Sequence, residues 1–265
     1  MIRVVNGKLQ DNERPLVVVD RSVMLQRIER FVPDGADIVL PDVFFHEAAQ
    51  CDPSREGPVF DRWANRHANR IWMARFWRDL SREESTPSCL VAPERIIHSE
   101  LTQSFRQALR TGGLNWRQCV PEPDAESRRA DFVSICSKFS EFVHSQHPDW
   151  KARLQSMDER VKWVRHPEQV AEAVRIQNER LRDPMWDDVV VGFPDRLAVS
   201  RIARVIVWYA LCYSLGKTRG FGNNWEDAEY AVTASYIGRL ITTDHGLADA
   251  VEACFPSCDV QTQLR

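Results

Sequence analysis

The chain lacks any apolar run of the roughly 18 residues that a helix needs to cross a bilayer. Its apolar stretches are short or interrupted, as at 16–19 and 205–211. The N-terminal segment MIRVVNGKLQDNER has no apolar core of the kind that a secretory signal contains. We therefore expect a cytoplasmic protein with no membrane partner.

Paired cysteines are also missing. The seven cysteines are scattered along the chain, and none forms a Cys-x-x-Cys pair. This pattern disfavours a disulfide scaffold or a four-cysteine zinc site, and it favours buried thiols in a reducing compartment. His144 and His147 stand at helical spacing, but no third ligand is near them in the sequence. A surface helix is therefore favoured over a zinc site.

Lysine is scarce, with five residues among the 35 basic ones, so arginine supplies nearly all of the positive charge. The formal net charge of -3 excludes a protein that wraps nucleic acid through bulk positive charge. A local arginine patch that binds phosphates stays open, because the guanidinium group matches phosphate with two parallel hydrogen bonds.

The two ends of the chain carry an α/β pattern. An apolar run at 16–19 predicts a buried strand that ends at Asp20, and Met24, Ile28 and Phe31 predict the inner side of a helix after it. Other elements are predicted as follows: a strand at 37–40 and a helix that contains Phe44, Phe45 and Glu47; helices at 194–215, 225–237 and 246–253; and strands at 240–243 and near 259–263. Alternating strands and helices favour a parallel sheet.

Between these ends, residues 51–184 have a different character. Helical periodicity appears at 61–82, 93–110, 124–147 and 167–182, and we find no convincing strand there. The length of 265 residues suits one enlarged domain. We therefore expect a single domain over 1–265, with a core from 1–50 and 185–265 and a helical insertion at 51–184.

Four acidic residues are candidates for one site. Asp20 and Asp244 each follow a predicted strand, and the carboxyl ends of parallel strands share one edge of a sheet. Either Asp alone can equally cap the next helix. Glu47 lies about one turn into a helix, and Asp227 lies in a first turn where Asn224 is a plausible N-cap. Converging acids repel unless a cation neutralises them, and such hard oxygen ligands select Mg²⁺ or Mn²⁺ over zinc.

The segments LVVVDRSVML, LPDVFFHEAAQ and NNWEDAEYAVTASYIGRLITTDHGL resemble the PIN-domain family of metal-dependent ribonucleases. The resemblance covers about 50 residues at the start and 70 at the end, and the long gap between Glu47 and Asp227 exceeds that of a minimal PIN domain. The matching positions are Asp20 with Ser22 two places on, Glu47, Asp227 in D-x-x-Y-x-x-x-A with Tyr230 and Ala234, and Asp244 after Thr242 and Thr243 and before Leu247.

The resemblance implies a three-layer α/β/α PIN-like fold and a Mg²⁺- or Mn²⁺-dependent endoribonuclease. Asp20, Glu47, Asp227 and Asp244 would then be both metal-binding and catalytic, while Ser22 and Thr243 would orient a carboxylate or a water. The implied substrate is a single-stranded or tRNA-like RNA, and the products carry a 5′-phosphate and a 3′-hydroxyl. A homodimer, a regulatory protein partner and a toxin-like or phage-defence role rest on family analogy alone.

An arginine-rich segment at 61–82 could hold the nucleic acid. Arg62, Arg66 and Arg70 are spaced four apart, so a helix would place them on one face with aromatic residues between them. The alternative is a solvated arginine face over buried aromatics. Arg128 and Arg129 form a weaker patch that we assign to the surface.

Two other functions stay open. A structure-selective DNA nuclease could use the same acids, although no helix–hairpin–helix pattern is visible. A non-catalytic PIN-like scaffold, as a subunit of a larger complex, would have no reason to assemble four repelling acids.

Overall fold

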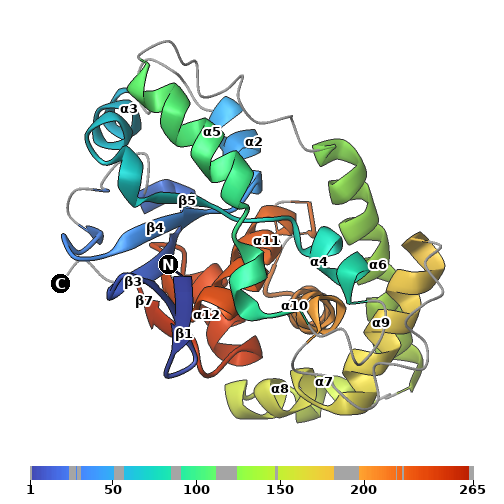
Figure 1. Ribbon diagram of the computed structural model, residues 1–265. Helices are drawn as coiled ribbons and strands as arrows, with labels where there is room; N and C mark the ends of the chain where they lie inside the picture. The colour runs from blue at the N-terminus through green and yellow to red at the C-terminus, as the bar shows by residue number, and fades with distance from the viewer. Residues whose placement is uncertain are drawn as a thin grey trace.

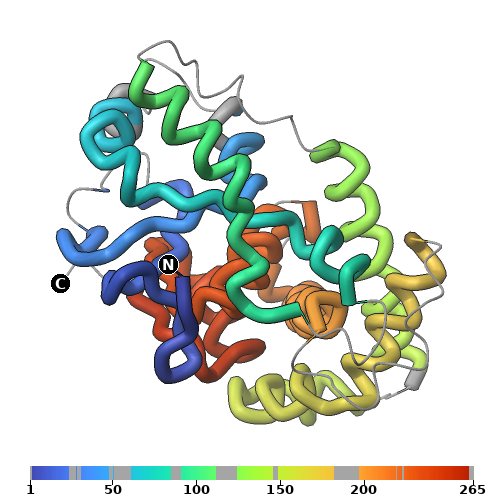
Figure 2. The backbone as a smooth tube through the Cα atoms, in the orientation of Figure 1, coloured from blue at the N-terminus to red at the C-terminus, as the bar shows by residue number. Residues whose placement is uncertain are grey.

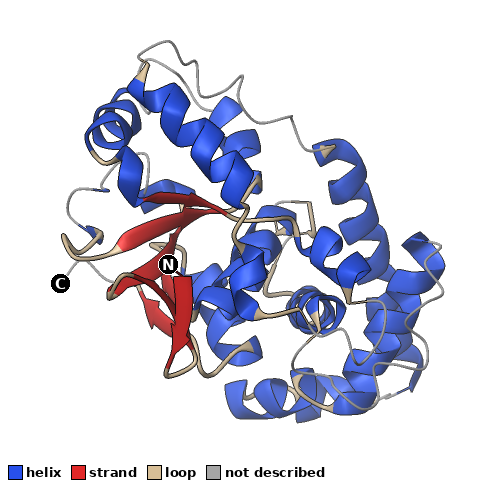
Figure 3. Ribbon diagram, in the orientation of Figure 1, coloured by secondary structure: helices blue, strands red, loops and turns tan. Residues whose placement is uncertain are grey.

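The computed structural model describes residues 2–23, 28, 31–50, 57–84, 91–111, 124–146, 149–181, 197–218, 220–222 and 224–262. These residues form an α/β fold in which the strands gather on one side and many helices lie beside them (Figure 3). The predictions for Met24, for His147 and for the cysteines at 51, 89 and 119 concern residues outside the described ones.

Seven strands form one mixed sheet. The strands are β1 (Ile2–Val5), β2 (Lys8–Asp11), β3 (Arg14–Val19), β4 (Asp37–Leu40), β5 (Ile71–Met73), β6 (Arg239–Ile241) and β7 (Asp259–Gln261). Five of them are parallel in the order β5-β4-β3-β6-β7, with β3 paired to both β4 and β6. The predicted parallel sheet is therefore confirmed for these strands.

At its N-terminal end the sheet also has two antiparallel strands that the sequence pattern does not predict. Strands β1 and β2 form an antiparallel hairpin, and β2 pairs antiparallel with the start of β3. Their side chains are mostly exposed or half-buried, so they lack the continuous apolar run that identified β3. Positive φ angles at Asn6 and Gly7 close the hairpin, a conformation that asparagine and glycine tolerate best.

A second correction concerns the insertion, where no strand was expected. Strand β5 lies inside it and pairs parallel with β4, Met73 beside Leu40. The predicted helix at 61–82 is thus two helices with β5 between them. Three apolar residues flanked by arginines are too few to show a strand period, so only pairing with β4 selects the extended form.

The helices cover the sheet and continue beyond it (Figures 1 and 2). Helix α11 packs on β3, α12 on β7 and α5 on β5, while α10 contacts α4, α6, α8, α9, α11 and α12. The helices are α2 (Val43–Ala49), α3 (Gly57–Arg66), α4 (Trp77–Glu83), α5 (Ser99–Arg110), α6 (Ala125–Gln146), α7 (Trp150–Arg153), α8 (Met157–Val164), α9 (Pro167–Leu181), α10 (Ala198–Ser214), α11 (Trp225–Ile237) and α12 (His245–Cys254), with short 3₁₀ turns η1 (Ala68–Arg70) and η3 (Pro93–Ile96).

Helix α11 positions the candidate site, and its predicted bounds are confirmed. It ends at Gly238, whose φ of 84° is a left-handed C-cap that glycine adopts without strain. Buried residues lie all around the helix, because the sheet covers one side and α10 another.

The apolar and thiol groups behave as the sequence predicted. Ile28 and Phe31 are buried. Among the described cysteines, the free thiols of Cys136, Cys212, Cys254 and Cys258 are all buried. No helix in the described part of the chain is long and apolar enough to span a membrane.

Candidate metal and nucleic-acid site

Asp20 lies where β3 and β6 end side by side. Its backbone N donates to the carbonyl of Ile241 at 2.9 Å, which extends the pairing of the two strands by one residue. Its Oδ2 accepts hydrogen bonds from Ser22 Oγ at 2.6 Å and from Thr242 Oγ1 at 3.0 Å. Ser22 Oγ also lies 2.7 Å from Thr243 Oγ1. The predicted Ser22 and Thr243 thus stand beside Asp20, and Thr242 joins them.

Glu47 reaches the same region from α2. Tyr230, which is fully buried on α11, donates its hydroxyl proton to Glu47 Oε2 at 2.7 Å. Arg21 Nη1 lies 3.8 Å from Glu47 Oε1. Burial raises the pKa of Glu47 to about 8, against the opposing effect of the Tyr230 hydrogen bond, and the negative charge of Asp20 adds to the rise. Desolvation and the negative charge of Asp20 therefore destabilise the charged form of Glu47.

Asp227 lies in the first turn of α11, within electrostatic reach of the other acids. Burial raises its pKa well above the usual value, and the negative charges of Asp244, Asp20 and Glu47 raise it further, in that order. Its Oδ2 is 3.5 Å from the Tyr209 hydroxyl. The strongest neighbouring charges on Asp227 are thus those of the three other acids predicted from the sequence.

Asp244 is the most exposed of the four acids, and it also caps a helix. Its Oδ1 accepts from the backbone N of Gly246 at 2.6 Å and of Leu247 at 3.0 Å, at the start of α12. The capping alternative is therefore realised at Asp244. Asn224 occupies the N-cap position of α11, but its side chain makes no capping hydrogen bond.

The four acids are the type of ligand that a hard divalent cation prefers, but they do not lie close enough together to surround one. The side chains offer carboxylate oxygens, and burial together with mutual repulsion destabilises their charged forms. In the described part of the chain, however, no three His, Cys, Asp or Glu side chains lie close enough to form a ready metal shell. The acids share one neighbourhood without converging on one point.

The predicted arginine stripe is divided by the structure. Arg62 and Arg66 are exposed on α3. Arg70 lies beyond that helix in η1, where its Nε donates to the carbonyl of Ala36 at 3.0 Å and its guanidinium lies over the Trp63 ring at 5.7 Å. Trp63 itself is buried. The prediction of one helical face with three arginines is therefore wrong for Arg70, because strand β5 ends the helix early.

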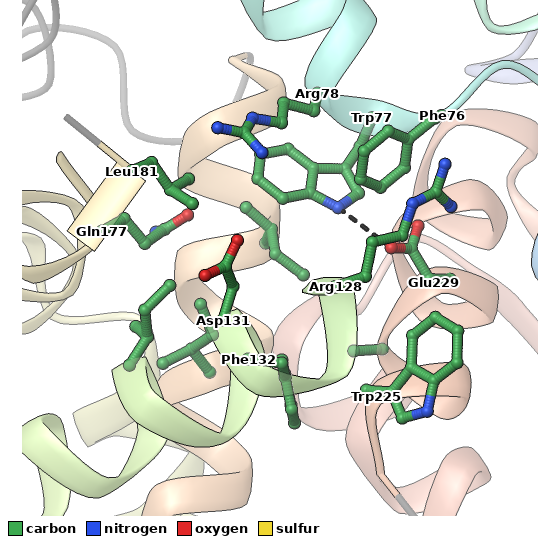
Figure 4. A pocket seen from close by; sticks show the side chains of 14 residues that line it. Phe76, Trp77, Arg78, Arg128, Asp131, Phe132, Gln177, Leu181, Trp225 and Glu229 are labelled. Carbon is green, nitrogen blue, oxygen red and sulfur yellow. Dashed lines mark hydrogen bonds between the residues drawn. The ribbon is translucent and has the colours of Figure 1, made fainter. Parts of the chain in front are cut away.

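The surface assignment of Arg128 is also wrong. Arg128 on α6 forms an ion pair with Asp42, Nη1 to Oδ2 at 2.7 Å, and its guanidinium lies 3.5 Å from the Phe76 ring centroid. Beside it, Trp77 Nε1 donates to Glu229 Oε1 at 3.2 Å (Figure 4). Burial and the charge of Asp42 raise the pKa of Glu229, which Arg128 opposes. A lone arginine in a helical pattern gives no sign of such a buried pairing.

The residues around Arg128 line a small pocket where α4, α6, α9, α10 and α11 meet (Figure 4). Its volume of about 40 Å³ is enough for ordered water, which needs roughly 10–15 Å³ per molecule. Both amide atoms of the buried Gln177, which lines the pocket, have no hydrogen-bond partner among the described residues. Water could satisfy that amide, and the pocket lies between helices α4, α6 and α9 of the insertion and helices α10 and α11 of the core.

Comparisons of the chain with protein-family models, with curated proteins and with solved structures found no match. The resemblance of the four motifs around Asp20, Glu47, Asp227 and Asp244 to PIN domains therefore stays a prediction. Support for a function therefore comes from the arrangement of these residues in the structure.

Proposed function

We propose that the protein is a Mg²⁺- or Mn²⁺-dependent endoribonuclease of PIN-like architecture. The single observation that supports it most is the position of Asp227, whose strongest charged neighbours are Asp244, Asp20 and Glu47. Asp227 and Glu47 lie on α11 and α2, Asp20 follows β3, and Asp244 is the N-cap of α12. A stable core has no need for such a repelling set.

The order of the strands in the sheet supports the proposal. A parallel arrangement β5-β4-β3-β6-β7 with helices α5 and α11 packed on it agrees with a three-layer α/β/α sandwich. Asp20 and Asp244 then stand at the carboxyl edge of neighbouring strands, where ligands of open α/β sheets bind.

The proposed reaction is hydrolysis of an RNA phosphodiester. A bound divalent cation would neutralise the acids, lower the pKa of a water molecule and stabilise charge on the leaving oxygen. Asp20, Asp227 and Asp244 would hold that cation, with Glu47 directly or through water, once the side chains that now share one neighbourhood move together around it. The water oxygen becomes bonded to phosphorus, the P–O3′ bond breaks, and the leaving oxygen takes up a proton, which gives a 5′-phosphate and a 3′-hydroxyl.

Neighbouring hydroxyl groups have a positioning role in this proposal. Ser22 and Thr242 donate to Asp20, and Tyr230 donates to Glu47, so each carboxylate is held in one orientation. Thr243 lies within hydrogen-bond distance of Ser22 and completes the set around Asp20.

The RNA would be single-stranded or tRNA-like, and the protein would act in the cytoplasm. Arg62 and Arg66, which are exposed on α3, would contact the phosphates of the RNA. A homodimer or a regulatory partner, and a toxin-like or phage-defence role, belong to the same proposal by family analogy.

A test compares the wild type with Asp20→Asn, using Asp249→Asn as the matched control. Asp249 is exposed on α12 and takes no part in the site. With Mn²⁺, we expect cleavage of single-stranded RNA or tRNA to fall by roughly 100-fold or more in Asp20→Asn, the size of losing one group that stabilises transition-state charge. Asp249→Asn should cleave like the wild type. Full activity of Asp20→Asn, or activity that persists in EDTA, would contradict the proposal.

Two further measurements separate the alternatives. Cleavage of flap DNA in preference to RNA would identify a structure-selective DNA nuclease. Calorimetry with Mn²⁺ alone reports on the site independently of any substrate. Absence of Mn²⁺ binding, together with absence of cleavage, would favour the non-catalytic scaffold.

A further inference from the structure

A second charged site lies at the other end of α11. It is a cavity of about 450 Å³ between the last turn of α11, the start of α10 and the segment after α12. Nine residues separate Asp227 from Tyr236, which is roughly 14 Å along a helix axis. The lining includes Arg165, Arg201 and Arg204, with Ser235, Tyr236 and Phe255.

The three arginines are held by carbonyl groups at the ends of helices. Those carbonyls belong to the last turns of α11 and α12, where each helix dipole supplies about half a negative charge. The contacts are Arg165 Nε to Ala253 O at 2.7 Å, Arg201 Nη1 to Ser235 O at 2.9 Å, and Arg204 Nη1 to Cys254 O at 3.3 Å. The C-terminal ends of α11 and α12 thus supply about one negative charge in total, against the three positive charges of the arginines.

Acidic side chains do not neutralise the rest of the positive charge of the three arginines. Among the described residues that line the cavity there is no aspartate or glutamate. Glu84 acts on Arg201 electrostatically, but its Oε2 accepts from the backbone N of Ala198 at 2.6 Å and it lies outside the lining. Burial lowers the pKa of both Arg201 and Arg204, although Tyr236 and Glu84 oppose the fall at Arg201, so an anion bound beside them would stabilise their charged forms.

Two donors in this place are unused. The side chain of Tyr236 is 4% exposed, and its hydroxyl oxygen interacts with the Arg201 guanidinium, but its hydroxyl proton has no acceptor among the described residues. The Arg201 guanidinium lies over the Tyr236 ring at 4.2 Å, and its buried Nε also lacks a partner there. Buried donors without partners destabilise a fold by about 1–3 kcal/mol each, so such groups commonly serve a ligand or an ordered water.

We propose that this cavity binds a small molecule that carries a phosphate monoester, through Arg165, Arg201, Arg204 and the Tyr236 hydroxyl. A phosphate monoester is the anion that fits best, because its charge approaches -2 and guanidinium forks bind its oxygens in pairs. The volume lies within the range of roughly 300–1,000 Å³ that small-molecule sites have, which allows a nucleoside monophosphate. This site does not depend on the nuclease proposal.

The test is calorimetry of the full chain with inorganic phosphate and with adenosine 5′-monophosphate, at constant ionic strength. EDTA is present, so that no metal at the acid end contributes to the signal. Adenosine is the neutral control ligand. We expect one binding site per chain for both phosphate compounds and no binding of adenosine.

Three variants locate the binding. Arg165→Gln should weaken binding of the monophosphate by about 10-fold or more, the equivalent of one charge-assisted hydrogen bond, and Tyr236→Phe by about 5-fold. Tyr236→Phe removes only one oxygen and keeps the packing of α11. It therefore tests the site even if Arg165→Gln weakens binding by disturbing the fold. Arg180→Gln, in which an arginine paired with Asp131 on α6 is lost, is the control and should bind normally. The proposal would be overturned if the wild type does not bind phosphate. It would also be overturned if Arg165→Gln and Tyr236→Phe both bind the monophosphate as tightly as the wild type does.

Discussion

Helix α11 joins two sites of opposite charge. Its first turn contributes Asp227 to the acid cluster, which we define as Asp20, Glu47, Asp227 and Asp244. Its last turn contributes Tyr236 to the arginine cavity, which we define by Arg165, Arg201 and Arg204. Each site collects like charges, and burial opposes the charged form in both.

The two sites differ in what holds their charges. Three of the acids receive hydrogen bonds from hydroxyl groups, as from Tyr230 to Glu47, and mainly repel one another. The arginines donate to carbonyls such as Ala253 O, which would otherwise lack a partner at a helix end. The arginines therefore also support the fold. Among the acids Asp244 caps a helix, whereas burial and like charge oppose the charged forms of Glu47 and Asp227. Neutralising an acid and neutralising an arginine should consequently change stability in opposite directions.

The largest effect is expected from Asp227→Asn. Cleavage of RNA should fall by roughly 100- to 1,000-fold, because one group that stabilises transition-state charge is lost. The free energy of unfolding without metal should rise, because Asn keeps the shape of the side chain and removes a buried acid beside Asp20, Glu47 and Asp244. Cleavage rates and urea unfolding in EDTA measure the two quantities.

The control for Asp227→Asn is Asp249→Asn on α12, an exposed position at which neither quantity should change. If Asp227→Asn unfolds more easily than the wild type, then Asp227 is a structural group and the contrast between the two sites fails. A stable variant with normal cleavage would remove Asp227 from the catalytic set.

The sequence predicts the acid cluster better than the arginine cavity. Asp20 and Asp244 each follow an apolar run, and the pairing of β3 with β6 places them near each other, as the strand pattern indicates. The arginines come from α8 and α10, and they meet only because those helices pack against the ends of α11 and α12. Periodicity within one helix carries no information about such a meeting.

The same limit explains the errors in the fold. Helix α11 and strand β4 have the predicted bounds, because their signals are local: a cap at Gly238 and an apolar run. The sequence predicts a helix where strand β5 lies, since Ile71–Met73 is extended only through pairing with β4. The prediction for Arg70 fails for the same reason, and that for Arg128 fails because its partner Asp42 lies far away in sequence.

A smaller effect tests Glu84, an acid that acts electrostatically on Arg201. Burial raises the pKa of Glu84 to about 7 from 4.5, against the hydrogen bond from Ala198 N, so the folded protein holds this proton more tightly than the unfolded chain does. The stability that Glu84 contributes is full below about pH 4.5 and is lost as the pH rises to about 7. Urea unfolding at pH 4.5 and 8 should show a loss on the order of 3 kcal/mol in the wild type relative to Glu84→Gln.

Glu84→Gln keeps an oxygen for Ala198 N, so a change in the pH dependence alone is the expected signature. Parallel pH profiles for the wild type and Glu84→Gln would mean that Glu84 titrates normally. Arg201 would then have an acid partner at neutral pH, and the surplus positive charge of the arginine cavity would be smaller by one unit.

The smallest effect is expected at Arg165, and it has the opposite sign to that at Asp227. Arg165 donates to Ala253 O at 2.7 Å and to Glu252 O at 3.0 Å, which ties the end of α8 to the last turn of α12. Arg165→Gln should lower the free energy of unfolding by about 1–2 kcal/mol, because two carbonyls at the negative end of a helix lose a charged donor. Arg153→Gln, an exposed change on α7, is the matched control in urea unfolding. If Arg165→Gln is as stable as the wild type, the arginines do not support the helix ends, and ligand binding alone would account for their position.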